Sequence, residues 1–307
     1  RLEELMRIGD FVTIFRDGKL VADAAVKDID VPWIVKQMVG EGKSYPKRDV
    51  AVDWDKQENV LEVKNLSLPK NGGGYLLNNV SFNLKKGEIL GIYVLLGAGR
   101  TEIFECIMGM RPNHTGDIIL NGKKIEIQSV ADQIDKGFAW LPEDRQREGL
   151  VQTMSIAKNI ALSNIGKYTN PLGLIDKSKE DAAEAEMIKD VHIKVADKDL
   201  PILSLSGGNQ QKVVFAKGAL TNPQIMLLDE PSRGIDIGAK TEIFHLIYQY
   251  AKRGVSLLVI SSELEEIIAI ADRILVLSNG IKTAELTGDD ITQDNLVKAS
   301  YMGHKAN

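Results

Sequence analysis

The fold class is decided by the stretch Leu205-Ser206-Gly207-Gly208-Asn209-Gln210-Gln211-Lys212, together with the apolar run Ile225-Met226-Leu227-Leu228-Asp229-Glu230 that follows it. A Ser-Gly-Gly sequence that opens a helix presents free backbone N–H groups and the positive end of the helix dipole, which favours an anion such as phosphate. The apolar run predicts a buried parallel strand with two acids at its carboxyl end, where open α/β sheets bind ligands. Taken alone, the first stretch also fits a capped surface helix with Ser206 as N-cap and no ligand.

A phosphate-binding loop is predicted upstream of both stretches. Gly91-Ile92-Tyr93-Val94 is typical of a strand end, and Leu95-Leu96-Gly97-Ala98-Gly99-Arg100-Thr101 then leads into a helix. In the pattern G-x-x-x-x-G-K-[ST], backbone N–H groups and a lysine bind phosphates and a hydroxyl binds Mg²⁺. Gly97, Gly99 and Thr101 fit this pattern.

Two positions of this loop depart from the pattern. Val94 replaces its first glycine and Arg100 its lysine. Arginine keeps the charge but is a planar fork, and a β-branched valine fits only if the backbone there is extended. Taken alone, the loop fits an ordinary glycine-rich turn as well as it fits a phosphate-binding loop. The downstream strand that ends in Asp229 and Glu230 disfavours the ordinary turn.

Composition indicates a globular chain with a substantial core. The 307 residues are 44% hydrophobic and 26% charged, with a net charge of −5, which argues against a dedicated nucleic-acid surface. The single cysteine, Cys106, excludes an internal disulfide and suits a reducing compartment. No apolar run reaches the roughly 20 residues of a membrane-spanning helix.

The order of the remaining elements predicts a mainly parallel sheet, because strands alternate with helices. Expected strands are 59–66, 79–84 and 255–260, with a hairpin at 117–125 around Asn121-Gly122; expected helices are 154–163, 177–190 and 237–253.

An internal repeat links the two ends of the chain. Leu2–Asp10 matches Leu264–Asp272, and an apolar strand and an X-Gly turn follow in each copy, Asp17-Gly18 and Asn279-Gly280. With a slip of one position, Met38-Val39-Gly40 matches Tyr301-Met302-Gly303. The common order and spacing favour duplication. The first copy is therefore expected to be the tail of a domain like the one that ends with the second copy.

The two opening stretches and the phosphate loop resemble the ABC ATPase family. GAGRTE, PEDRQREGL, LSGGNQQK, EPSRGIDIGAK and ISSELEE, with the tandem copy, resemble more closely the second nucleotide-binding domain of bacterial monosaccharide import ATPases. The resemblance implies an α/β P-loop NTPase of ABC type. A mainly parallel sheet core is expected beside an antiparallel β subdomain and an α-helical subdomain at about 150–220. Residues 1–40 would be the tail of a truncated first ATPase domain, 41–58 a linker and 59–307 the second domain.

The resemblance also implies roles for single residues. Each ATP would lie between the phosphate loop of one domain and the Ser-Gly-Gly helix of the other. Glu230 would act as base or water-positioner, and Thr101, Asp229 and Glu143 would hold Mg²⁺. Tyr75 would stack on adenine, or is an ordinary loop tyrosine. The other nucleotide contacts would be Gly97, Ala98, Gly99, Arg100, Thr101, Ser206, Gly207, Gly208 and Gln210.

Four departures from the family pattern bear on this site, and three of them, at Val94, Arg100 and Ser262, are expected to make it degenerate. Besides Val94 and Arg100, Glu143 stands at the family's glutamine position, although the run that it opens also fits a solvated charged surface. Ser262 stands where the family has a switch histidine. The site is expected to bind nucleotide and to hydrolyse it slowly or not at all, so the isolated chain would be a weak or inactive ATPase.

The implied partners are sugar permease membrane subunits, the first ATPase domain of the same chain and, indirectly, a periplasmic or extracellular sugar-binding protein. The implied location is the cytoplasmic face of the bacterial plasma membrane. Two alternatives stay open. One is a catalytically inert nucleotide-binding regulatory module. The other is a non-transport ABC ATPase, which would usually carry a basic surface or a long coiled-coil insertion.

Overall fold

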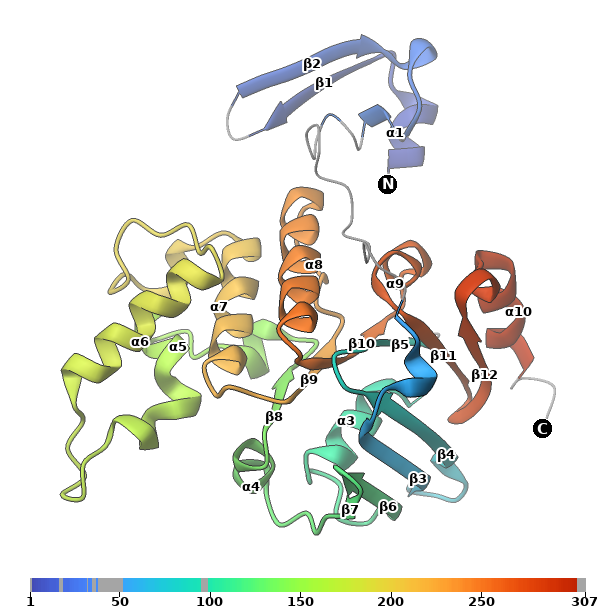
Figure 1. Cartoon of the computed structure of the whole chain (residues 1–307). Helices are drawn as coiled ribbons and strands as arrows, with labels where there is room; N and C mark the ends of the chain where they lie inside the picture. The colour runs from blue at the N-terminus through green and yellow to red at the C-terminus, as the bar shows by residue number, and fades with distance from the viewer. Residues whose placement is uncertain are drawn as a thin grey trace.

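The computed structural model of the protein describes residues 2–16, 19–31, 33–34, 37, 52–94 and 99–302. Within these residues, a six-stranded sheet forms the centre of the molecule, in the order β12-β11-β5-β10-β9-β8 (Figure 1). Neighbouring strands are parallel, except in the β11–β12 hairpin. The predicted mainly parallel sheet is therefore confirmed. Its strands are β5 (Ile89–Val94), β8 (Phe138–Leu141), β9 (Ile225–Asp229), β10 (Ser256–Ser261), β11 (Arg273–Ser278) and β12 (Ile281–Thr287).

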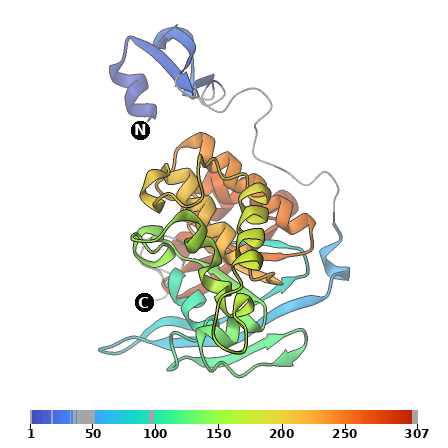
Figure 2. The ribbon, with the colours of Figure 1, turned by 90° about the vertical axis from the view of Figure 1, so that its left-hand side faces the viewer.

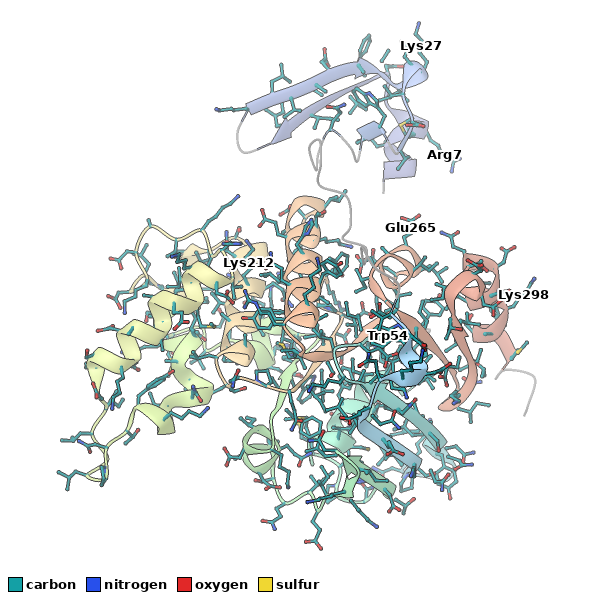
Figure 3. All side chains as sticks on the ribbon, in the orientation of Figure 1. Arg7, Lys27, Trp54, Lys212, Glu265 and Lys298 are labelled. Atoms are coloured by element: carbon teal, nitrogen blue, oxygen red, sulfur yellow. The ribbon has the colours of Figure 1, made fainter. Side chains whose placement is uncertain are left out.

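The parallel strands are apolar along their whole length because both of their faces are covered. In β5, Ile89 and Tyr93 pack into a core under the helices α7, α8, α9 and α10, whereas Leu90 and Ile92 pack into a second core that includes α3. Figure 3 shows Glu265 on α9 and Lys298 on α10 pointing away from the sheet. The helices are α3 (Arg100–Ile107), α4 (Val130–Asp135), α7 (Gly207–Ala219), α8 (Ile237–Lys252), α9 (Leu264–Ile270) and α10 (Gln293–Met302).

An antiparallel sheet adjoins the second core. Among the described residues its order is β4-β3-β6-β7, with β3 (Asn59–Pro69), β4 (Tyr75–Lys85), β6 (Thr115–Leu120) and β7 (Lys123–Lys124). The predicted hairpin turn is confirmed, since Asn121 and Gly122 both have positive φ, 50° and 75°. Both long strands extend beyond their predicted limits.

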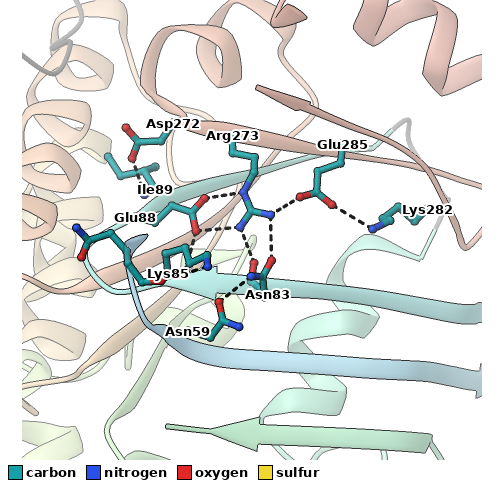
Figure 4. Close-up of polar contacts among 10 residues, drawn as sticks. Asn59, Asn83, Lys85, Glu88, Ile89, Asp272, Arg273, Lys282 and Glu285 are labelled. Carbon is teal, nitrogen blue, oxygen red and sulfur yellow. Dashed lines mark hydrogen bonds and ion pairs between the residues drawn. The ribbon is translucent and has the colours of Figure 1, made fainter. Parts of the chain in front are cut away.

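A buried polar cluster joins the two sheets at the amino end of β5 (Figure 4). Arg273 donates from Nε to Glu88 Oε1 at 2.8 Å and from Nη2 to the Asn83 carbonyl at 2.8 Å, and it also pairs with Glu285. Glu88 is fully buried, so loss of this partner would leave a buried carboxylate without its ion pair. The cluster lies at the opposite edge of the sheet from the acids that end β9.

A further group of helices lies beside the sheet in Figure 1 and faces the viewer in Figure 2. They are α5 (Ile156–Ala161), which continues into the 3₁₀-helix Leu162–Tyr168, and α6 (Lys177–Asp190), which agrees with its predicted range. The first of these was predicted to begin at residue 154. It begins at 156 because the Ser155 hydroxyl accepts a hydrogen bond from the Lys158 N–H and caps the helix.

The N-terminal segment consists of α1 (Leu2–Ile8), β1 (Phe11–Arg16) and β2 (Lys19–Ala25), with a small core of its own around Val12, Ile14 and Ile34. Its hairpin repeats the register of β11–β12. Val12 pairs with Ala24 as Ile274 pairs with Leu286, and the register shifts after Ile14 as it does after Val276. The predicted turn Asp17-Gly18, the match at 38–40 and residues 41–51 of the predicted linker lie outside the described residues.

Candidate functional site

The carboxyl ends of the parallel strands bring the predicted site residues to one edge of the sheet. Thr101 and Asp229 meet there: the threonine hydroxyl donates to Asp229 Oδ2 at 2.7 Å. Burial raises the pKa of Asp229 to about 6, against the hydrogen bond from Thr101 and the charge of Arg100, while Glu230 and Glu102 raise it further. The other oxygen, Asp229 Oδ1, is buried and has no hydrogen-bond partner within the described residues. A buried oxygen in this situation is suited to a cation.

Arg100 forms the centre of an ion-pair cluster. Its Nη1 lies 2.6 Å from Glu230 Oε1, and its Nη2 pairs with Glu143 Oε1. Glu143 Oε1 also pairs with Nη1 of Arg233. Arg100 thus holds the predicted base and the predicted metal ligand together, an arrangement that its planar fork allows.

Glu230 has a constrained backbone. Its φ of 46° lies in the left-handed region, which is uncommon for a residue with a side chain and which recurs at functional sites. Its N–H donates to the Ile260 carbonyl at 3.0 Å, and its Oε1 accepts from the Ser262 N–H at 2.9 Å. The Ser262 segment therefore contacts Glu230 through its backbone.

The start of α3 lies against the start of β4. Gly99 has φ of +86°, and a Cβ there would come within 2.6 Å of the Leu76 carbonyl oxygen, so the position requires glycine. Tyr75, next to Leu76, is 57% exposed. The tyrosine is accordingly close to the predicted phosphate loop and accessible. Gly97 and Ala98 lie outside the described residues.

The Ser-Gly-Gly stretch does open a helix, α7, with Ser206 at the N-cap position. The Ser206 side chain does not cap the helix; its Oγ instead accepts from Asn209 Nδ2 at 3.2 Å, and the residue is exposed. Backbone N–H groups of the first turn are thus left for another acceptor. Gln210 is buried, and its amide contacts the Leu205 carbonyl and Gln146, so its predicted nucleotide contact stays a prediction.

The glycines of this stretch also have packing roles. A Cβ on Gly208 would lie 2.4 Å from the Ala239 Cβ, and one on Gly207 would lie 2.9 Å from Arg145 Nη2. Lys212, labelled in Figure 3, further fixes α7, because its ammonium lies 2.6 Å from Glu242 Oε2 on α8. These contacts hold the first two turns of α7 against α8 and Arg145.

The sequence did not reveal the contacts of Arg145. This residue opens a single π-helical turn at Arg145–Gly149, a feature often found at functional sites. It donates to the carbonyls of Arg233 at 2.7 Å and Gly234 at 3.1 Å. Arg145 thereby joins the segment after β8 to the loop after Glu230 and to the first turn of α7. The charged run 143–147 was visible in the sequence, but its partners were not.

The chain that carries these site residues matches a known protein family. The family model for ABC transporters matches residues 77–233, which is more than half of the chain.

The chain belongs to the ABC transporter family.

Solved structures of ABC cassettes share its fold. The ADP conformation of the ATP-binding cassette MJ1267 superposes with a TM-score of 0.70 at 20% identity, covering 81% of this chain and all of that one. A nucleotide-free ATP-binding cassette gives 0.69 at 21% identity, over 78% and 96%. The predicted ABC cassette fold is confirmed.

Similar ABC proteins are import ATP-binding proteins. The chain is 42% identical over 301 residues to the ribose import ATP-binding protein RbsA of Clostridium perfringens, covering 97% of this chain and 58% of that protein. It is 40% identical over 301 residues to the xylose import ATP-binding protein XylG of Photobacterium profundum, over 97% and 59%. The chain thus spans less than two thirds of the length of these relatives.

The residues of this ABC cassette fit Mg²⁺ and a nucleotide. Among the described residues, no group of three or more His, Cys, Asp or Glu side chains is arranged to hold a metal ion by itself. Mg²⁺ would instead be held by Thr101 and the unpartnered oxygen of Asp229, with nucleotide phosphates and water completing its shell. Glu143 pairs with two guanidinium groups, so its role as a metal ligand stays a prediction.

Within the part of the chain that the structure describes, no helix has both the length and the apolar character to cross a bilayer.

Proposed function

We propose that this chain is part of an ATP-binding and ATP-hydrolysing subunit that powers monosaccharide import through a membrane permease. The observation that carries the proposal is the convergence of Thr101 with Asp229 and of Arg100 with Glu230 at one sheet edge. The similarity to ribose and xylose import proteins supports the substrate class. ATP and Mg²⁺ are the proposed cofactors.

The chain is proposed to contain one cassette and the tail of another: residues 1–40 form the tail of a first cassette, 41–58 a linker and 59–307 the second cassette. The common hairpin register supports this division. Burial supports it too, because Ile8 and Phe15 are 86% and 66% exposed, whereas their counterparts Ile270 and Leu277 are 7% and 0% exposed. In the second cassette, β11 pairs with β5, and Ile270 and Leu277 are buried in the two cores on either side of the sheet. The first hairpin would pair with the equivalent strand of a first cassette in the same way.

Two ATP molecules would then lie between two cassettes. Ser206, Gly207 and Gly208 would complete the site of the first cassette, while the loop at 97–101 would form the second site with Tyr75. The second site is proposed to be degenerate. Three features support this: Val94, Ser262 in place of the switch histidine, and the engagement of Arg100 by two acids.

The permease contact is proposed at 143–150, the segment that Arg145 joins to the Ser-Gly-Gly helix. Through the permease, a periplasmic or extracellular sugar-binding protein would influence ATP turnover. The proposed place of work is the cytoplasmic face of the bacterial plasma membrane, as a peripheral subunit.

The ion pair between Arg100 and Glu230 favours a second candidate, a catalytically inert nucleotide-binding regulatory module. The full-length protein, reconstituted with its permease in liposomes, separates the two. Phosphate release should rise when the sugar-loaded binding protein is added and should not rise with the sugar-free one. ATP binding with no phosphate release in either arm would favour the inert module. A subunit that fails to bind nucleotide in liposomes would contradict both.

A further inference from the structure

The carboxylates of Glu143 and Glu230 both pair with Arg100, the residue that is predicted to bind nucleotide phosphates. We propose that Glu143 is a positioning residue that competes with nucleotide phosphates for Arg100 and thereby weakens nucleotide binding at this site. The proposal rests on the proposed function in one respect, since it takes a nucleoside triphosphate as the ligand. It assigns Glu143 a role opposite to that of a metal ligand, which would strengthen binding.

Arg100 is already engaged by two carboxylates. Its side chain is 10% exposed, and both terminal nitrogens pair with carboxylates, Nη1 with Glu230 and Nη2 with Glu143. A guanidinium has no acceptor and a fixed set of donors. A phosphate that binds Arg100 must therefore take over at least one donor that a carboxylate holds.

This exchange leaves neither carboxylate without a partner. Glu143 keeps its ion pair with Arg233, and Glu230 keeps the hydrogen bond from the Ser262 N–H at 2.9 Å. An unpaired buried charge would be strongly unfavourable. Because both acids keep these second partners, Arg100 can exchange a carboxylate for a phosphate at a moderate cost in free energy.

Glu143 is easier to displace from Arg100 than Glu230 is, so Glu143 sets this competition. Glu230 is 5% exposed and fixed by a left-handed backbone, whereas the Glu143 side chain is 21% exposed and is shared between two arginines. The less constrained carboxylate is the one that yields. On phosphate binding, Glu143 would be held by Arg233 alone, in the loop that Arg145 also binds.

The test compares Glu143→Gln with wild type, using isothermal titration of the purified chain with Mg²⁺ and the non-hydrolysable imido analogue of ATP. The glutamine keeps the shape of the side chain and removes its charge. We expect affinity to rise on the order of tenfold, the effect of one moderate coupling. In the absence of nucleotide, the same variant should melt at a lower temperature, because Arg100 loses a partner. A purely structural role would lower both stability and affinity.

Two further variants isolate the competition. Glu102→Gln removes an equal charge that also acts on Asp229, but Glu102 is not among the ion-pair partners of Arg100 in the described part of the chain. It should change affinity much less than Glu143→Gln. In the background Arg100→Gln, the gain from Glu143→Gln should disappear.

Equal gains from Glu102→Gln and Glu143→Gln would overturn the proposal, as would unchanged or weaker binding by Glu143→Gln. If wild type binds and only this gain is missing, the proposed function stands. If neither wild type nor any variant binds nucleotide, both fall.

Discussion

Val94 pairs with Leu277 across β5 and β11, and both side chains are fully buried. They belong to the core that also contains Phe104 of α3. Val94 is extended, the conformation that a β-branched residue prefers. The position that the phosphate-loop pattern assigns to glycine is thus used here for packing.

Replacing Val94 with glycine should lower the stability of the protein and raise its affinity for nucleotide. Val94→Gly should lower the free energy of unfolding by about 2–4 kcal/mol, through the lost side chain and the added backbone freedom. It should also strengthen Mg-ATP binding, because glycine allows the backbone to turn ahead of the loop. Urea unfolding and isothermal titration measure the two effects. Val94→Ala is the control, since alanine loses packing but remains restricted at positive φ. Equal affinities of the two variants would contradict this account.

Much of the fold was predictable because local patterns specified it. The apolar run that ends in Asp229 has the composition of a buried parallel strand, and the Asn121-Gly122 turn has the chemistry of a tight hairpin. The repeat of 2–10 at 264–272 predicted two similar hairpins. Element ends were less accurate, as at Ser155, because a single capping hydrogen bond decides them.

The contacts of the charged site residues were not predictable from the sequence. Glu143 was expected near Mg²⁺, and the structure pairs it with Arg100 at the start of α3 and with Arg233 in the loop after Glu230. Which charges pair depends on how the strand ends are arranged in space, and no spacing along the chain encodes it. Gly207 and Gly208 were expected as anion ligands, yet they also permit the close approach of Arg145 and α8.

The hydrogen bond between Thr101 and Asp229 predicts a role in the Mg²⁺ dependence of nucleotide binding. Thr101→Val keeps the shape of the side chain and removes the oxygen, so nucleotide binding should lose most of its response to Mg²⁺ while binding without metal changes little. Thr101→Ser, which keeps the hydroxyl, should behave like wild type. Titrations of ATP with Mg²⁺ and with excess EDTA provide the comparison. An undiminished Mg²⁺ response in Thr101→Val would exclude the hydroxyl as a ligand.

The ion pair between Asp190 and Arg253 predicts pH-dependent stability. Asp190, at the end of α6, accepts two hydrogen bonds from Arg253 at 2.6 and 2.7 Å and one from the Tyr250 hydroxyl. The Arg253 hydrogen bonds hold the pKa of Asp190 below its usual value, against a smaller effect of burial. Because the folded-state pKa is depressed, this stabilisation is complete above the unfolded-state pKa of about 3.9 and is lost as pH falls through the folded-state value.

Arg253→Gln should therefore destabilise the protein at pH 7 by about 1 kcal/mol, a modest value because the arginine is half exposed. The difference from wild type should shrink as pH falls below about 3.9. Urea unfolding at pH 7 and pH 3 measures it. Tyr250→Phe is the matched comparison, since it keeps the arginine. A difference that stays constant with pH would mean that Arg253 acts through packing on Tyr250 and not through the charge of Asp190.

The last prediction concerns the two composite sites of the proposed full-length transporter. Ser206 opens α7 with an exposed, uncapped N-terminus, whereas Glu230 is held by Arg100 in a site that has Ser262 at the switch position. Ser206→Arg should abolish most ATP hydrolysis, because it blocks the site that this helix completes for the first cassette. Glu230→Gln should have a smaller effect, because it alters the degenerate site.

The two outcomes are far enough apart to be decided by steady-state phosphate release from the reconstituted transporter. Loss of one interaction made only in the transition state reduces the rate by about 10²–10³. Ser206→Ala is the control for Ser206→Arg, since it removes the hydroxyl without filling the site, and it should retain more activity. If Glu230→Gln is as inactive as Ser206→Arg, the site of this cassette is itself catalytic. Arg100 must then release Glu230 in every turnover, and the proposal of a degenerate second site is wrong.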